Sequence, residues 1–325
     1  MQLVANVIRG DRVESIHRAE AVVVDSAGNT IFATGNPDLQ TYVRSSAKPF
    51  QAYPLVESGA AESFHLTPKE LALCCASHNS EPEHLKTVRN VQERTGISEE
   101  MLLCGTHKPL DEETANDVLR NGLELTPNYN NCSGKHTGML LACKHLSLSL
   151  ENYGDPKHPL QVRIREYLEN ILERSPIHMG IDGCSVPTFF LTIREVASAF
   201  RRLASADDPL LATIYNAMTQ EPYMVAGRNR FDTAIMEAAP GSIISKVGAE
   251  GVRALGIRRG DEIYGMALKI LDGNKRASAP VALKIFEHLG WLDALSQKGL
   301  GEYISPKIAN RAGLRVGQIT VRIIQ

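Results

Sequence analysis

The sequence lacks the features that mark several large classes of protein. Its 35 lysines and arginines nearly balance its 37 aspartates and glutamates, for a formal net charge of −2, so no surface for nucleic acid is indicated. No stretch approaches the roughly eighteen consecutive apolar residues that a membrane-spanning helix requires. Residues 1–7 contain neither a charged segment nor a long apolar core, so we expect no secretory signal and a cytoplasmic protein.

Cysteine is also scarce, with six residues in a chain of 325, which excludes a disulfide-built scaffold. No two of them form a Cys-x-x-Cys pair of the kind typical of zinc sites. Cys74 and Cys143 follow apolar runs, so we expect them in a core. Cys132 and Cys184 instead lie among glycine, serine and asparagine. From the residues alone, two unrelated buried thiols and a shared zinc remain equally open.

No internal repeat, low-complexity tract or linker divides the chain, and its patterns differ between the ends and the middle. Strand patterns occur at residues 3–7, 12–16, 21–24, 30–33, 243–247, 262–270 and 318–324. Helical patterns occur at 49–59, 68–74, 82–95, 112–121, 136–146, 160–172, 190–204, 209–219 and 280–296. We therefore predict an α+β fold, in which strands from the N- and C-terminal parts form one antiparallel sheet and a helical region is inserted. A single domain would span residues 1–325, with its sheet part at about 1–45 and 240–325 and its helical part at about 46–239.

The segment 44–50 contains a serine and a lysine at a spacing suited to catalysis. Ser45 and Lys48 are three residues apart, so in a helix they share one face and the amine approaches the hydroxyl. Pro49 supports a helix start, because the first turn has no intrahelical use for its N–H groups. A lysine that accepts the proton of a serine makes that serine a nucleophile. The spacing alone is more typical of a solvated helix start.

Four further polar segments are candidates for a site. The segment 75–81 contains Ser77 and follows an apolar helix, where capping of helix ends is the simpler interpretation. A loop at 104–109 carries a single histidine, His107. The segment 130–139 runs into a helix and is rich in donors, as a ligand site would be, but it lacks the spacing of a phosphate loop. The segment 182–188 is a second polar loop with a thiol.

A strand followed by glycines, at 245–251, presents Lys246 to a ligand that approaches the backbone. With Ser45 and Lys48 it repeats the logic of penicillin-recognising serine enzymes, which combine Ser-x-x-Lys with a Lys-Thr-Gly strand. Val247 stands where that pattern has threonine, so we do not expect action on β-lactams.

Taken together and in order, these segments resemble the rhizobial-type L-asparaginases, also called the asparaginase II family, over nearly the whole chain. The matching motifs are Arg9-Gly10, Val13-Glu14-Ser15, His17-Arg18, Arg44-Ser45-Ser46-Ala47-Lys48-Pro49-Phe50-Gln51, Cys75-Ala76-Ser77-His78-Asn79, Asn131-Cys132-Ser133-Gly134-Lys135-His136, Asp182-Gly183-Cys184, Gly227-x-x-Arg230-Phe231-Asp232-Thr233, Lys246-x-Gly248-Ala249-Glu250-Gly251 and Ala267-Leu268-Lys269-Ile270-x-Asp272-Gly273. One departure is Ser80, which precedes Glu81 where the commoner pattern of the family has glycine.

The resemblance implies a fold similar to serine β-lactamases and glutaminases, and hydrolysis of the side-chain amide of L-asparagine to aspartate and ammonia. It implies two Ser–Lys pairs, Ser45 with Lys48 and Ser77 with a lysine from a distant strand. We assign that lysine to Lys246, with Lys269 as the alternative because it also lies on an expected strand.

The resemblance further implies substrate binding by His107, Asn131 and Arg230. It implies a zinc ion held by Cys132, Lys135 and Cys184, and a homodimer. Two alternatives stay open. One is a glutaminase of the same mechanism, because one methylene changes binding by only about 1–3 kcal/mol. The other is a non-catalytic protein that binds zinc or a small amide.

Overall fold

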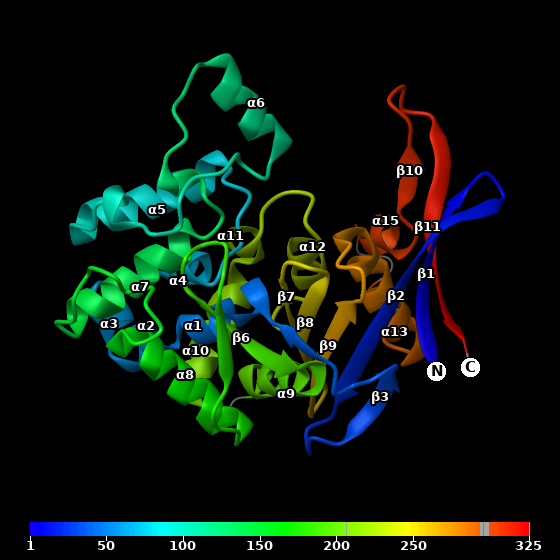
Figure 1. Ribbon diagram of the computed structural model, residues 1–325, viewed down its shortest axis with the longest axis horizontal. Helices are drawn as coiled ribbons and strands as arrows, with labels where there is room; N and C mark the ends of the chain where they lie inside the picture. The colour runs from blue at the N-terminus through cyan, green and yellow to red at the C-terminus, as the bar shows by residue number, and fades with distance from the viewer. Residues whose placement is uncertain (206, 293–294, 296–298, 325) are drawn as a thin grey trace. The chain divides into compact units, whose positions relative to one another are not determined.

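The computed structural model describes residues 1–205, 207–292, 295 and 299–324 (Figure 1). The chain divides into two compact units. The sheet unit comprises Met1–Ser46, Leu191–Ala204 and Ala234–Gln325, and the helical unit comprises Ala47–Phe190 and Ser205–Thr233. Three elements contain a boundary between the units: η1 (Arg44–Ala47), β6 (Pro187–Thr192) and α12 (Phe231–Ala238).

The sheet unit is built around an eight-stranded sheet with the order β10-β11-β1-β2-β9-β8-β7, in which β3 also pairs with β2 (Figure 1). Its neighbouring strands pair antiparallel. The strands of this unit are β1 (Gln2–Arg9), β2 (Arg12–Val24), β3 (Thr30–Thr34), β4 (Gln40–Tyr42), β7 (Ile243–Val247), β8 (Val252–Arg259), β9 (Glu262–Ile270), β10 (Lys307–Ala309) and β11 (Arg315–Ile324).

Helices cover this sheet with apolar faces. α9 (Ile193–Ala204) packs on β2, β8 and β9 through residues at helical spacing, such as Val196, Phe200 and Leu203. α13 (Ser278–His288) packs on β1, β9 and β11. The remaining helices of the unit are η4 (Lys275–Ala277) and α15 (Gly301–Ile304).

The helical unit surrounds α7 (Ser133–His145), which contacts α1, α2, α3, α4, α5 and α8 and is buried from its first residue to Cys143. Gly134 makes the close approach of α4 to α7 possible, because an added Cβ would lie 2.4 Å from the carbonyl oxygen of Leu73. The other helices are α1 (Lys48–Gln51), α2 (Tyr53–Glu57), α3 (Ala60–Ser63), α4 (Pro68–Cys74), α5 (Pro82–Thr95), η2 (Glu99–Met101), α6 (Glu112–Arg120), η3 (Pro127–Tyr129), α8 (Pro159–Leu172), α10 (Pro209–Gln220) and α11 (Pro222–Val225).

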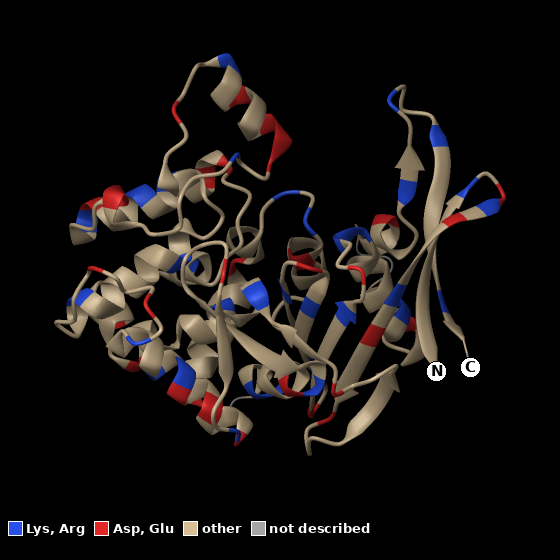
Figure 2. Ribbon diagram, in the orientation of Figure 1, with Lys and Arg blue, Asp and Glu red and all other residues tan. Residues whose placement is uncertain are grey.

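Charged residues of both signs lie along the ribbon of α5 in this unit (Figure 2). A short hairpin of β5 (His178–Ile181) and β6 pairs antiparallel in the same unit. Among the described residues, no helix combines the length and the apolar character that crossing a bilayer requires.

The α+β class, with an antiparallel sheet from both ends of the chain and helices between, is confirmed. That the chain is a single domain stays a prediction. Several details of the prediction were wrong. The strands expected at 12–16 and 21–24 are one strand, β2, and β8 was missed because its residues are buried on both faces and show no alternation. Strands also occur in the middle of the chain, at β5 and β6.

Several helix boundaries also differ, and the helix expected at 49–59 is two short helices, α1 and α2. α7 begins at residue 133 rather than 136, and the first residues of the helix expected at 190–204 belong to β6. The helix expected at 280–296 ends at His288 as α13, and residues 293, 294 and 296 of that range lie outside the described residues.

Candidate active site

Lys48 is the first residue of α1 and is followed by Pro49, so the predicted helix start is confirmed. Ser45 lies one turn earlier, in the 3-10 helix η1, and is half-buried. The Lys48 side chain is 1% exposed, and its Nζ donates to the carbonyl oxygens of Ala76, at 2.5 Å, and Asn131, at 3.3 Å. Ala76 directly precedes Ser77, so the Lys48 amine reaches the segment that carries the second candidate serine.

Ser77 lies beyond the end of α4 and is buried. Its N–H donates to the carbonyl of Val225 at 3.0 Å, and the N–H of Asn79 donates to that of Ala226 at 2.8 Å. Helix capping does not explain Asn79, because Cys75 is the C-cap of α4 and the N-cap of α5 makes no side-chain cap. The Asn79 side chain instead donates to the carboxylate of Glu81 and to the carbonyl of Arg228, in the loop after α11.

His78 is buried beside Ser77 and both of its ring nitrogens are engaged. The N–H of Ser80 donates to Nδ1 at 3.1 Å, which assigns the ring proton to Nε2, 2.9 Å from the Ser133 hydroxyl. Burial, and then electrostatic interactions with His84, Lys48, His107 and Arg230, in that order, hold the pKa of His78 well below its ordinary value. His78 is therefore neutral at pH 7, and three of the candidate site residues lie within electrostatic reach of it.

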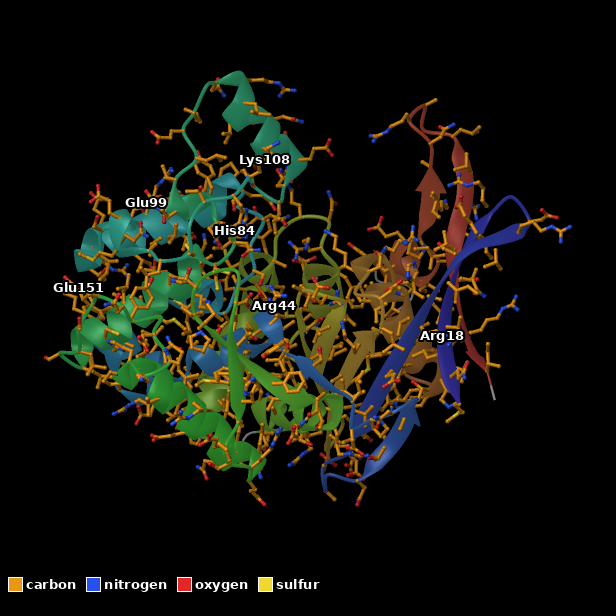
Figure 3. All side chains as sticks on the ribbon, in the orientation of Figure 1. Arg18, Arg44, His84, Glu99, Lys108 and Glu151 are labelled. Atoms are coloured by element: carbon orange, nitrogen blue, oxygen red, sulfur yellow. The ribbon has the colours of Figure 1, made fainter. Side chains whose placement is uncertain are left out.

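A column of rings extends from His78 through α5. His84, labelled in Figure 3, stacks on His78 with ring centroids 5.2 Å apart and on Tyr223 at 4.8 Å. Burial lowers the pKa of His84 as well, so the column stays uncharged and packs as an aromatic stack.

Ser80 adopts a left-handed conformation, with φ of 64°. This is a conformation that glycine adopts without strain, and the commoner motif has glycine at this position. The Ser80 hydroxyl donates to the carbonyl of Tyr129 at 2.6 Å, which offsets part of the strain.

The three residues proposed from the sequence for substrate binding all lie in the helical unit. The N–H of Asn131 donates to Nε2 of His107 at 2.9 Å, and Nδ1 of His107 donates to the carbonyl of Lys108 at 2.6 Å. The guanidinium of Arg230 donates to Oδ1 of Asn79 at 2.7 Å. Asn131 therefore contacts both His107 and Lys48. Arg230 instead bonds to Asn79, two residues after Ser77.

The two segments that carry Cys132 and Cys184 lie next to each other. Cys132 is the N-cap of α7, Lys135 lies in its first turn, and Cys184 lies in the loop between β5 and β6. All three are buried, Nζ of Lys135 donates to Sγ of Cys184 at 3.0 Å, and the thiols of Cys132 and Cys184 are close enough that each shifts the pKa of the other. The alternative that Cys132 and Cys184 are two unrelated buried thiols is therefore excluded.

Charges around this cluster shift its ionisation. The hydrogen bond from Cys184 and, against burial, the charges of Lys48 and Lys135 hold the pKa of Cys132 well below its ordinary value. The same hydrogen bond, and then burial, raises the pKa of Cys184. Within the described residues, no group of three or more His, Cys, Asp or Glu side chains is arranged for a metal ion. A metal at this cluster would therefore need Lys135 as a ligand.

The two lysines considered as partners of Ser77 belong to the sheet unit and differ in their surroundings. Lys246, on β7, is fully buried, and its Nζ donates to the carbonyl of Val247 at 3.1 Å. Lys269, on β9, is half-buried, and its amine donates to the carbonyl of Glu250. Burial lowers the pKa of Lys269. The pairing of Ser77 with Lys246 stays a prediction.

Sequence reasoning missed Glu81 as part of the site, although it stands four residues after Ser77 in the same motif. Its carboxylate is 1% exposed and accepts hydrogen bonds from three other residues. A single acidic residue directly before a helix is typical of a helix start, so the local sequence does not distinguish Glu81 as a site residue.

A family model described as L-asparaginase II matches residues 5–321 of the chain. Among solved structures, the chain is similar to a "putative beta-lactamase" from Bacteroides dorei DSM 17855, with 12% identity and a TM-score of 0.41 over 87% of this chain and 92% of that one. It is also similar to Mglu in its native form, with 9% identity and a TM-score of 0.39 over 91% of this chain and 66% of that one. No curated protein matches.

Proposed function

Because the chain belongs to the L-asparaginase II family, a family of amide-hydrolysing enzymes, we propose that it hydrolyses L-asparagine to L-aspartate and ammonia with a serine nucleophile that lysine activates. The observation that best supports this mechanism is the contact of the buried Lys48 amine with the carbonyl of Ala76, directly before Ser77. Among the residues that the structure describes, the hydrogen-bond acceptors of this lysine include no carboxylate, so it is suited to exchange a proton with a nearby hydroxyl.

In this mechanism the hydroxyl of Ser45 or Ser77 attacks the carbon of the side-chain amide. The lysine takes the hydroxyl proton and passes it to the nitrogen, which leaves as ammonia. Water then attacks the acyl-enzyme, with the same lysine as the base, and aspartate is released. Asn131, His107 and Arg230 hold the substrate, and the guanidinium is suited to its α-carboxylate.

The thiol cluster is suited to a zinc ion. Cys132, Cys184 and Lys135 would hold the metal, because two sulfurs and an amine are donors that zinc accepts and they already lie in contact. A bound zinc ion supplies a Lewis acid that polarises an oxygen of a ligand. The test is metal analysis of the purified wild-type protein beside Cys184→Ser. About one zinc per chain in the wild type and none in the variant would support this proposal, and no zinc in either would refute it.

The test of the proposed function is ammonia release from L-asparagine and L-glutamine by the purified protein. We expect release from asparagine, with a kcat/KM at least ~10-fold above that for glutamine, since one methylene in a fitted pocket is worth roughly that much. Preference for glutamine would identify a glutaminase. No release from either amide would refute the proposal. The homodimer also stays a proposal, which sedimentation of the same sample tests.

A further inference from the structure

Glu81 is a buried carboxylate whose two oxygens are both saturated by donors of the helical unit. Oε1 accepts from the N–H of Arg228 at 2.8 Å and from Nδ2 of Asn79 at 2.9 Å. Oε2 accepts from the hydroxyl of Tyr223 at 2.8 Å and from Nε of Arg228 at 2.8 Å. An ionised carboxylate is costly to bury without such partners, so this arrangement constrains every group that takes part in it.

The carboxylate decides which way the amide of Asn79 points. Nδ2 of Asn79 donates to Oε1 of Glu81 and to the carbonyl of Arg228, at 3.0 Å, and both of these oxygens can only accept. Rotating the amide by half a turn would bring Oδ1 against two acceptors and lose both bonds. Oδ1 therefore faces the opposite way, where it accepts from Nη1 of Arg230 at 2.7 Å.

The same carboxylate holds the loop that carries Arg230 close to the Ser77 segment. Gly227 has a φ of 115°, and an added Cβ would lie 2.3 Å from Oε1 of Glu81. Only glycine lets the backbone pass so near the carboxylate. The two residues before it, Val225 and Ala226, bond to the backbone of Ser77 and Asn79. Arg230 is partly exposed, and its charge acts on His78, the neighbour of Ser77.

We propose that Glu81, acting through Asn79, is a positioning residue that holds the guanidinium of Arg230 for the α-carboxylate of the amide substrate. This inference rests on the proposed function. A carboxylate is what distinguishes asparagine from a simple amide such as 3-aminopropanamide, which is asparagine without that group. A guanidinium recognises a carboxylate through two parallel hydrogen bonds, and their strength depends on orientation. An arginine that swings freely would bind both amides with similar affinity.

The experiment compares Glu81→Gln with the wild type on both amides. The matched control is Glu83→Gln, two residues along, whose carboxylate pairs with Lys69 at the surface. We expect Glu81→Gln to raise KM for asparagine at least ~10-fold with kcat within a few-fold, and to leave kcat/KM for 3-aminopropanamide nearly unchanged. Arg230→Gln should raise KM for asparagine by a similar factor. The double variant should have a KM no higher than that of either single variant, because Glu81 acts on the substrate through Arg230.

Asn79→Ala keeps the carboxylate and removes the link, so it should show the same loss of preference and covers the case in which Glu81→Gln fails to fold. If Glu81→Gln lowers the melting temperature while the preference for asparagine stays at the wild-type value, the role is structural only and the proposal is overturned. The proposal is also overturned if the control, Glu83→Gln, shows the same loss of preference for asparagine.

A wild type that releases no ammonia overturns the proposed function, and binding then decides the role of Glu81. Titration calorimetry with L-aspartate should give about tenfold weaker binding for Glu81→Gln than for the wild type. Equal binding by both proteins, or none by the wild type, would overturn the positioning role.

Discussion

The two units of this protein bury their polar groups in different ways. In the sheet unit, Lys246 bonds to the carbonyl of the next residue, and Arg253 bonds to Ser245 on the adjacent strand. In the helical unit, Lys48 bonds to the carbonyl of Asn131, 83 residues away, and Tyr223 bonds to Glu81 across 142 residues. The bond of Arg253 to Ser245 thus forms when β7 and β8 pair, and Nη2 of Arg253 also donates to Ser278 of α13 at 3.4 Å. Lys48 and Tyr223 of the helical unit form these bonds only when distant segments assemble, so the candidate site forms with the tertiary structure.

The largest expected effect tests whether both units contribute to the chemistry. Ser77→Ala, in the helical unit, and Ser45→Ala, in the sheet unit, should each lower kcat/KM for asparagine by at least ~100-fold, the scale of losing a catalytic group. Both variants should stay folded, as circular dichroism and melting curves would show.

The control is Ser46→Ala, next to Ser45, whose hydroxyl donates to the carbonyl of Val43 at 2.7 Å. It should lose about 1 kcal/mol of stability and keep its activity within a few-fold. Wild-type turnover by a folded Ser45→Ala protein would confine the nucleophile to the helical unit.

The next prediction distinguishes the two lysines of the sheet unit. Lys246→Met should lower kcat/KM about 100-fold, because the amine is fully buried and the resemblance to the family assigns it to proton transfer with Ser77. Lys269→Met should stay within a few-fold of the wild type, since its amine bonds to the backbone of Glu250 and is half-exposed. The opposite result, an active Lys246→Met and an inactive Lys269→Met, would reverse the assignment.

A third prediction concerns stability and pH. Against the effect of burial, the hydrogen bond from Arg94 and those from Thr67 hold the pKa of Glu70, in the helical unit, below its ordinary value. A lowered carboxyl pKa stabilises the fold above the ordinary pKa, and that contribution is lost as pH falls through the lowered value. Glu70→Gln should therefore lower the free energy of unfolding by about 1 kcal/mol at pH 7 and make it fall less steeply below pH ~4.5.

Urea titrations of wild type and variant between pH 7 and pH 3 measure this difference. Glu14→Gln in the sheet unit is the control, because Glu14 and its partner Arg9 are both exposed and water screens the pair. Parallel pH curves for Glu70→Gln and the wild type would show that Glu70 does not contribute in this way.

The smallest effect is expected at Ser80. Ser80→Gly removes a left-handed strain of about 1 kcal/mol but also the hydrogen bond to Tyr129, worth a similar amount, so stability should change by less than about 0.5 kcal/mol. Ser80→Val keeps the strain, loses the bond and should cost more than about 1 kcal/mol. Urea denaturation of the two variants tests this, and a stabilisation above about 1 kcal/mol by glycine would mean that the bond contributes little.

Local signals in the sequence were sufficient for many of the elements. Both ends of α4 and α5 were predicted correctly, because each helix begins with a proline and α4 carries the capping pair Thr67 and Glu70. The strand expected at 30–33 was also predicted correctly as β3, which pairs with β2 after a turn that contains Gly28 at φ 86°. Such signals act within a few residues, so folding the rest of the chain does not alter them.

The candidate site was determined by the sequence only as a set of residues. Residue type, spacing and the family resemblance singled out Ser45, Lys48, Ser77 and the two thiol loops. The tertiary structure decided which of these residues contact one another. The Lys48 amine bonds to the carbonyl of Ala76, and Cys132 lies beside Cys184, which is 52 positions further along the chain. Glu81 shows the reason most clearly. Its role depends on Tyr223 and Arg228, more than 140 residues away, and a hydrogen bond between such distant groups leaves no pattern in the sequence around either of them.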